Sequence, residues 1–321
     1  DERFSRGVFS ASQNGVLVYQ TGKVQTLSAL RWLDRSGAVL GTVGEPAQFF
    51  NVGPEISPDG TRATAPVVDL QTGIGDIWVI DLSRGTRSRF TAGPGDKFWS
   101  TWSRDGTRIA FNLANPSGRG YGIVSRQVGG SGAEEKLASD PVDFEFPLSF
   151  SPDGRFLLYS KQGNQRDDLW ILPLTGERKS QPFLVTPALE PMAQFSPNGR
   201  YVAYMSDEAG HYEIYVAGFP APSGRWQISQ SGGSEPRWSR DGKELFFFAP
   251  DNRLMAAQVK TDGANFEVGA IQPLFQTRSL GFGYRYDVAN QGNRFLVVAG
   301  LPQDLSPITI VTNWTGELAK K

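Results

Sequence analysis

The sequence predicts an all-β protein, and three observations support this prediction. Its 321 residues contain 37 Gly and 21 Pro beside 12% aromatic residues, which is typical of many short strands joined by tight turns. Hardly any window shows apolar residues at the 3.6-residue spacing of an amphipathic helix. Finally, one short turn sequence recurs along the whole chain, which indicates a repeat architecture.

The repeated turn has the form Ser-x-Asp-Gly or Ser-x-Asn-Gly. Its clear copies lie at 57–60, 103–106, 151–154, 196–199 and 239–242, and two degraded copies flank them at 12–15 and 289–292. The steps between copies range from 43 residues (196 to 239) to 50 residues (239 to 289). Asp-Gly and Asn-Gly supply the positive φ and the side-chain acceptor that a tight hairpin needs, so each copy predicts the first hairpin of a repeated unit.

Each unit contains four strand-like segments. In the third clear copy, the segment "PLSF" precedes the turn, and "FLLYS", "DLWILPL" and "PFLVT" follow it. Four antiparallel strands in about 45 residues correspond to one blade of a β-propeller, and blades must pack in a ring to cover both faces. We therefore expect a single β-propeller domain over residues 1–321. Seven copies predict seven blades, at 7–50, 51–97, 98–145, 146–190, 191–233, 234–280 and 281–321. Six blades is the alternative, and it would make the first copy irregular.

The blade motifs resemble those of a known family. "EPRWSRDGKELFFF" (235–248) and "PLSFSPDGRFLLYS" (147–160) resemble the repeat of TolB-like propellers, which are related to WD-repeat proteins. Residues 206–247 and the ending "ITIVTNWTGELAK" (308–320) more narrowly resemble the C-terminal propeller of bacterial membrane serine/threonine kinases. That second resemblance implies a sensor domain outside the membrane, in the periplasm or another extracytoplasmic space. The kinase signatures themselves are absent from this sequence, so no catalytic residue carries over.

Composition excludes several classes of partner. The 32 Lys and Arg balance 33 Asp and Glu, whereas nucleic-acid binding normally needs a basic excess, so we expect no nucleic acid partner. No apolar run approaches the roughly 18 residues that span a bilayer, so we expect no membrane insertion of this chain. Because the sequence begins at Asp1 without an initiator Met, we expect a processed product or fragment that an upstream transmembrane helix could have tethered. The absence of Cys excludes disulfides and thiolate metal sites.

Catalytic chemistry finds little support in the sequence. The only His is His211, in a predicted turn, and no Gly-x-Ser-x-Gly nucleophile motif occurs. One His cannot supply a His-rich metal site, and the Asp-x-Asp-x-Asp-Gly ladder of a calcium loop is missing. We therefore predict no catalytic residues, no metal and no cofactor. Glu55 and Asp287 are the only channel carboxylates that an enzyme built on this ring could use.

A candidate binding site follows from the position two residues before each turn. The residues there are all polar, and their neighbours toward the turn are all apolar: Ser10, Glu55, Thr101, Ser149, Gln194, Arg237 and Asp287. Alternation of this kind places one face of each inner strand in the core and the other in the central channel. The channel would then suit a small polar or zwitterionic ligand, with bulk water as the alternative.

Aromatic residues precede several of these polar positions. Phe50, Trp99, Phe146 and Tyr284 enter the inner strands and would rim one mouth of the channel. Alternatively, they wedge between neighbouring blades. Together these patterns predict a non-catalytic propeller that binds an unknown small polar ligand or a protein partner. The resemblance favours the sensor domain of a bacterial receptor kinase, and a free periplasmic TolB-like interaction module is the alternative.

Overall fold

The computed structural model describes residues 9–12, 14–20, 27–50, 52–114, 119–130, 132–140, 142–163, 166–261, 265–277, 283–301, 308–312 and 314. Within these residues the chain is almost entirely β-strand, with one short 3-10 helix at Asn290–Gly292. No described helix has the length and apolar character needed to cross a bilayer. The all-β prediction is confirmed.

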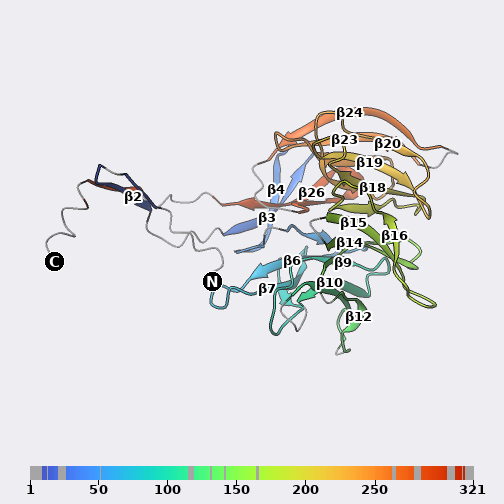
Figure 1. Ribbon diagram of the computed structural model, residues 1–321, viewed down its shortest axis with the longest axis horizontal. Helices are drawn as coiled ribbons and strands as arrows, with labels where there is room; N and C mark the ends of the chain where they lie inside the picture. The colour runs from blue at the N-terminus through green and yellow to red at the C-terminus, as the bar shows by residue number, and fades with distance from the viewer. Residues whose placement is uncertain are drawn as a thin grey trace.

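Strands β3 to β26 form six four-stranded sheets (Figure 1). The first contains β5 (Glu55–Ile56), β6 (Arg62–Val68), β7 (Gly75–Asp81) and β8 (Arg87–Arg89). The second contains β9 (Ser100–Trp102), β10 (Arg108–Ala114), β11 (Tyr121–Gln127) and β12 (Glu135–Ala138). The third contains β13 (Phe144–Phe150), β14 (Phe156–Gly163), β15 (Arg166–Pro173) and β16 (Gln181–Leu184). A single parallel pair, Tyr121 with Phe144, joins the second sheet to the third.

The remaining sheets complete the ring. The fourth contains β17 (Ala193–Phe195), β18 (Tyr201–Ser206), β19 (Glu213–Gly218) and β20 (Arg225–Gln227). The fifth contains β21 (Ser234–Trp238), β22 (Glu244–Phe248), β23 (Arg253–Lys260) and β24 (Glu267–Gln276). The sixth contains β25 (Tyr286–Ala289), β26 (Arg294–Gly300), β3 (Ser28–Asp34) and β4 (Val39–Ala47). The first strands of consecutive sheets contact one another in a closed cycle, β5–β9–β13–β17–β21–β25–β5, so the described sheets form a six-bladed propeller.

The sixth blade closes the ring by pairing the two ends of the chain. Strand β26 pairs antiparallel with β3 from Arg294–Asp34 to Gly300–Ser28, so two strands come from each end. Contacts with the fifth blade reinforce the closure. Arg35, in the β3–β4 turn, donates two hydrogen bonds of 2.9 Å to the carboxylate of Glu244. Closure through strand pairing avoids an open sheet edge at the point where the ring begins and ends.

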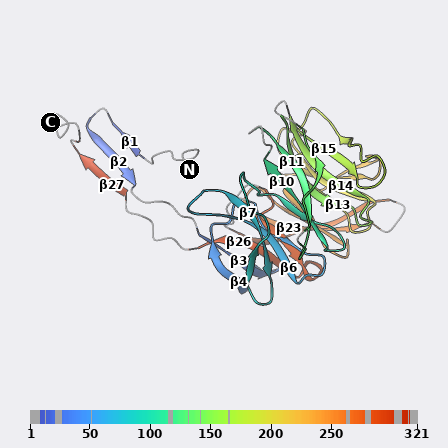
Figure 2. The same cartoon turned by 90° about the horizontal axis from the view of Figure 1, so that it is seen from below.

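The prediction of seven blades is corrected to six. The first turn copy lies between β1 (Phe9–Ala11) and β2 (Val16–Gln20), and β2 pairs with β27 (Ile308–Thr312) in a separate three-stranded sheet. This sheet stands apart from the ring in both views (Figures 1 and 2). The predicted blades 7–50 and 281–321 therefore each divide between this small sheet and the sixth blade. The physical reason is that β3 and β4, the third and fourth strands of the first repeat, supply the strands that the last repeat lacks.

The repeated turn owes its shape to a local hydrogen-bond set. In the copy at 103–106, the Ser103 hydroxyl donates to the Asp105 carboxylate at 2.6 Å and accepts from the Arg108 amide at 2.9 Å. The Gly106 amide donates to the Ser103 carbonyl at 2.9 Å, and Gly106 has a φ of 69°. The copies at 57–60, 151–154, 196–199 and 239–242 repeat this pattern. Each turn thus holds its inner strand against the second strand of the same blade.

Candidate functional site

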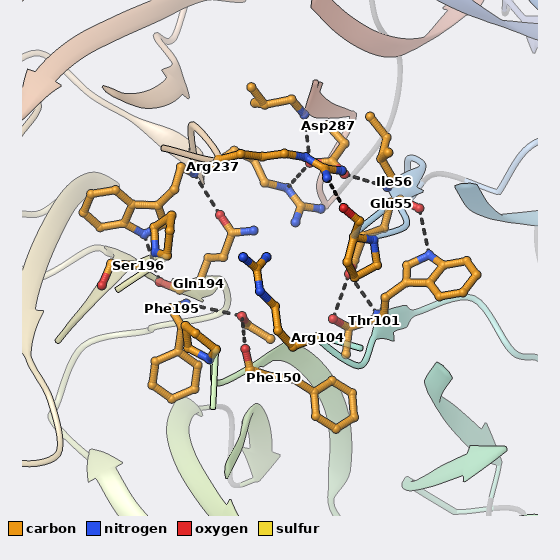
Figure 3. Close-up of a pocket in the computed structure, with 18 of the residues that line it drawn as sticks. Glu55, Ile56, Thr101, Arg104, Phe150, Gln194, Phe195, Ser196, Arg237 and Asp287 are labelled. Atoms are coloured by element: carbon orange, nitrogen blue, oxygen red, sulfur yellow. Dashed lines mark hydrogen bonds and ion pairs between the residues drawn. The ribbon is translucent and has the colours of Figure 1, made fainter. Parts of the chain in front are cut away.

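The ends of the inner strands nearest the repeated turns surround a central pocket of about 130 Å³. Figure 3 shows side chains from several blades converging on its opening. Six of the seven predicted channel residues line it: Glu55, Thr101, Ser149, Gln194, Arg237 and Asp287. The seventh, Ser10, lies on β1 in the separate sheet, so it is not part of this site. Whether the six bind a ligand is a proposal developed below.

Four of these side chains connect neighbouring blades. Each accepts a hydrogen bond from the backbone amide of the residue just before the next blade's turn. The donor and acceptor pairs are Trp102 N to Glu55 Oε1 (3.0 Å), Phe195 N to Ser149 Oγ (3.3 Å), Trp238 N to Gln194 Oε1 (2.9 Å) and Ile56 N to Asp287 Oδ2 (2.6 Å). The polar ring therefore has a structural role that the sequence analysis did not foresee.

A buried charge cluster lies at one side of the pocket. Arg237 is 3% exposed, its Nε lies 3.8 Å from Asp287 Oδ1, and its guanidinium lies over the Tyr284 ring at 3.8 Å from the centroid. Both Asp287 oxygens accept backbone amides, from Ile56 and Val288. Burial raises the pKa of Glu55 to about 7, although the positive charge of Arg237 opposes this rise. The cluster combines one buried cation with two carboxylates, one of which titrates near neutral pH.

Two further arginines lie at the opening, and the sequence analysis missed both. They occupy the second position of the turn, where the copies at 57–60, 151–154 and 196–199 have Pro. The Arg240 guanidinium donates to the carbonyls of Ser57 (2.8 Å) and Pro58, and so links the fifth blade to the first. Arg104 is exposed and points toward the middle of the opening (Figure 3). Among the described residues Arg104 has no hydrogen-bond or ion-pair partner. The replacement of Pro by Arg at this turn position was the feature of the sequence that could have identified both arginines.

The predicted aromatic residues lie outside this pocket. Trp99 and Tyr284 are 7% and 2% exposed, and their ring centroids are 6.3 Å apart. Phe146 lies 5.7 Å from Trp99, and Phe50 stacks on Phe98 at 4.9 Å. These contacts join residues of different blades. The side chains lie before or at the start of the inner strands, at the end of the channel away from the repeated turns. The Phe50–Phe98 and Trp99–Phe146 contacts join neighbouring blades, as the alternative of wedges predicts. The Trp99–Tyr284 contact instead joins the second and sixth blades, which are not neighbours in the ring. None of the four predicted aromatic residues lines the polar pocket.

The other groups that the sequence analysis considered for catalysis, His211, Glu55 and Asp287, form no catalytic arrangement in the described chain. The His211 Nε2 lies 2.9 Å from the Glu213 carboxylate, which also accepts the Gly232 amide at 2.9 Å. The described residues contain no group of three or more His, Cys, Asp or Glu side chains that could hold a metal ion. Glu55 Oε1 accepts hydrogen bonds from Thr101 and Trp102 of the next blade. Asp287 Oδ2 accepts the Ile56 amide of the first blade, and Oδ1 accepts the amide of the adjacent Val288.

Comparisons with solved structures agree on the fold. A candidate TolB from Agrobacterium tumefaciens superimposes with a TM-score of 0.66 at 18% identity, over 88% of this chain and 100% of that one. TolB from Acinetobacter baumannii gives a TM-score of 0.59 at 13% identity, over 90% of this chain and 66% of that one. A chain of a nidogen–laminin complex gives 0.57 at 10% identity, over 89% and 99%. No family model matches the chain, and no curated protein matches it.

The likeness shows a β-propeller fold similar to that of TolB, and the function has to be argued from the site. Similar structures also include propeller-containing enzymes, among them a prolyl endopeptidase (TM-score 0.50, 17% identity) and a hydrazine synthase from Kuenenia stuttgartiensis (TM-score 0.56, 14% identity). This chain covers 44% of the prolyl endopeptidase chain. Fold alone therefore does not separate a binding propeller from a catalytic one.

Proposed function

We propose that this propeller is a non-catalytic recognition domain and that the turn-side opening of its channel binds a partner. One observation supports this most strongly. Arg104 presents an unpaired guanidinium at the centre of the opening, whereas the charged groups around it are already engaged in contacts that hold the blades together. A rigid ring that presents one free charged group is suited to recognition, because little conformational entropy is lost on binding.

A protein or peptide partner fits this opening better than an enclosed metabolite. The cavity of about 130 Å³ is smaller than the roughly 300–1,000 Å³ of a typical small-molecule pocket. A single side chain of a larger partner can enter it while the partner's backbone lies on the surrounding turns. Among similar structures, the nidogen–laminin complex also contains a propeller in a protein assembly.

We further propose that the domain acts outside the cytoplasm as the sensor of a bacterial receptor serine/threonine kinase. The support is the resemblance of residues 206–247 and 308–320 to such propellers. A free periplasmic interaction module is the second candidate, and the TolB-like fold supports it equally.

The coding region upstream of Asp1 distinguishes these two contexts. A kinase domain followed by an apolar span is the expected finding for the receptor. A short cleavable signal alone would contradict the receptor proposal and leave the free interaction module.

The absence of native Cys allows a direct test of the opening. Arg104→Cys labelled with a bulky maleimide should block it, and Arg84→Cys, on the exposed β7–β8 hairpin of the first blade, provides a matched label elsewhere. Peptides selected from a random library on the unlabelled protein should bind the 104-labelled protein at least about tenfold more weakly, equivalent to ~1.4 kcal/mol. They should bind the 84-labelled protein normally. Equal binding to both labelled proteins, or failure to select any specific peptide, would contradict the proposed site.

A further inference from the structure

Two polar side chains at the opening carry hydrogen-bond donors that have no partner in the described chain. The Gln194 Oε1 atom accepts the Trp238 amide at 2.9 Å, which fixes the side chain and leaves its Nε2 donors without a partner in the described chain. The Arg104 guanidinium supplies five more N–H donors and has no partner there either. Figure 3 shows both side chains directed to the middle of the opening. In the pocket lining, Glu55 Oε1 and both Asp287 oxygens already accept backbone amides.

The charge of the opening also favours an acceptor that is negative. Three arginines (104, 237 and 240) face two carboxylates (Glu55 and Asp287), which leaves a net charge of at least +1. The volume of about 130 Å³ is enough for the end of one acidic side chain. We infer that the opening recognises a single carboxylate of its partner, an Asp or Glu side chain or a C-terminus, held between the Arg104 guanidinium and the Gln194 amide. This inference rests on the proposed function and specifies the chemistry of the partner.

A carboxylate is favoured over a phosphate by the same charges. With both resident carboxylates ionised the net charge of the opening is +1, so one negative charge balances it and a phosphate dianion exceeds it. The planar guanidinium can also bond both oxygens of a carboxylate at once. Inorganic phosphate is therefore the competitor that tests the class of ligand.

Two blocked tripeptides, acetyl-Gly-Glu-Gly-amide and its Gln counterpart, form a matched pair of probes for the folded chain. Binding is followed by NMR through the Gln194 side-chain amide and the Arg104 Nε–H signals. We expect saturable shifts with the Glu peptide and at least about tenfold weaker binding of the Gln peptide. Arg104→Gln should weaken the Glu peptide by about tenfold, and the control Arg84→Gln should not.

A second variant probes the amide without breaking its structural bond. Gln194→Glu keeps an acceptor for the Trp238 amide and replaces the free donors with a carboxylate, so it should abolish binding of the Glu peptide. Equal binding of the two tripeptides, no effect of either substitution, or displacement by phosphate at lower concentration than by acetate would each overturn the inference. If the label at position 104 still blocks the library-selected peptides, those results refute only the inference that the ligand is a carboxylate, and the proposed recognition site is retained. If the library also yields no specific peptide, or peptides that bind the 104-labelled and 84-labelled proteins equally, both the carboxylate inference and the proposed recognition site are refuted.

Discussion

Asp287 should be the most sensitive polar residue in the ring, because it contacts three blades where the ring closes. From β25 in the sixth blade it accepts the Ile56 amide of the first blade at 2.6 Å and faces the buried Arg237 of the fifth. Asp287→Ala would leave that amide without an acceptor and the arginine without its nearest carboxylate. Breaking a buried ion pair typically costs about 3–5 kcal/mol. Because Glu55 also faces Arg237, we expect a loss of about 3 kcal/mol.

Chemical denaturation and thermal unfolding test this value. At about 2 °C per kcal/mol for a large domain, Tm should fall by roughly 6 °C. The exposed Glu177→Ala is the matched control and should change the free energy of unfolding by less than about 0.5 kcal/mol. The double variant Asp287→Ala with Arg237→Met should recover part of the loss, because it removes the buried unpaired charge. An Asp287→Ala protein within about 1 kcal/mol of the parent, or a double variant less stable than the sum of its single changes, would refute this account of the closure.

Three further predictions concern burial, the turn and the closing hairpin. Burial raises the pKa of Glu190 to about 7, so the contribution of this carboxyl to stability should be lost as pH rises from about 4.5 to about 7. Glu190→Gln should make the fall in stability over this pH range smaller, by ~1–2 kcal/mol once solvent screening is allowed for. Parallel stability curves for parent and variant between pH 5 and 8 would contradict this. Ser103→Ala should cost about 1–2 kcal/mol in urea unfolding, because it removes the acceptor of a turn amide, and an unchanged midpoint would be the contrary result. Gly37→Ala should lower the free energy of unfolding, measured by calorimetry, more than Gly60→Ala does. Both glycines have positive φ, but a Cβ at position 37 would lie 2.7 Å from the Phe275 Cβ, whereas position 60 is open. Equal losses for the two variants would contradict the close packing at position 37.

The channel positions were predictable because the turn fixes the register of each inner strand. With the Ser of the turn located, alternation assigns the residue two positions earlier to the channel, and this placed Glu55, Gln194 and Arg237 in one pocket correctly. The same alternation could not show that these side chains also accept amides from the next blade. That role depends on the angle between blades, which no local pattern encodes.

The number of blades was not predictable, because the first repeat contains enough strands for a blade of its own. The choice lies in which partner β3 takes: β2 beside it in the sequence, or β26 at the other end of the chain. Both pairings satisfy strand propensity and alternation, so the decision depends on closure of the whole ring. Arg104 was missed for a simpler reason, since its turn was interpreted only as a hairpin.

The most direct test of the recognition site is to map where a library-selected peptide binds, by backbone amide chemical shifts of the labelled chain with and without peptide. Recognition at the opening predicts that the shifted amides cluster at the turn-side ends of β5, β9, β17 and β21, with the Gln194 side-chain amide among them. Shifts confined to outer strands such as β8 and β12, or to the sheet of β1, β2 and β27, would place the site elsewhere and contradict the account.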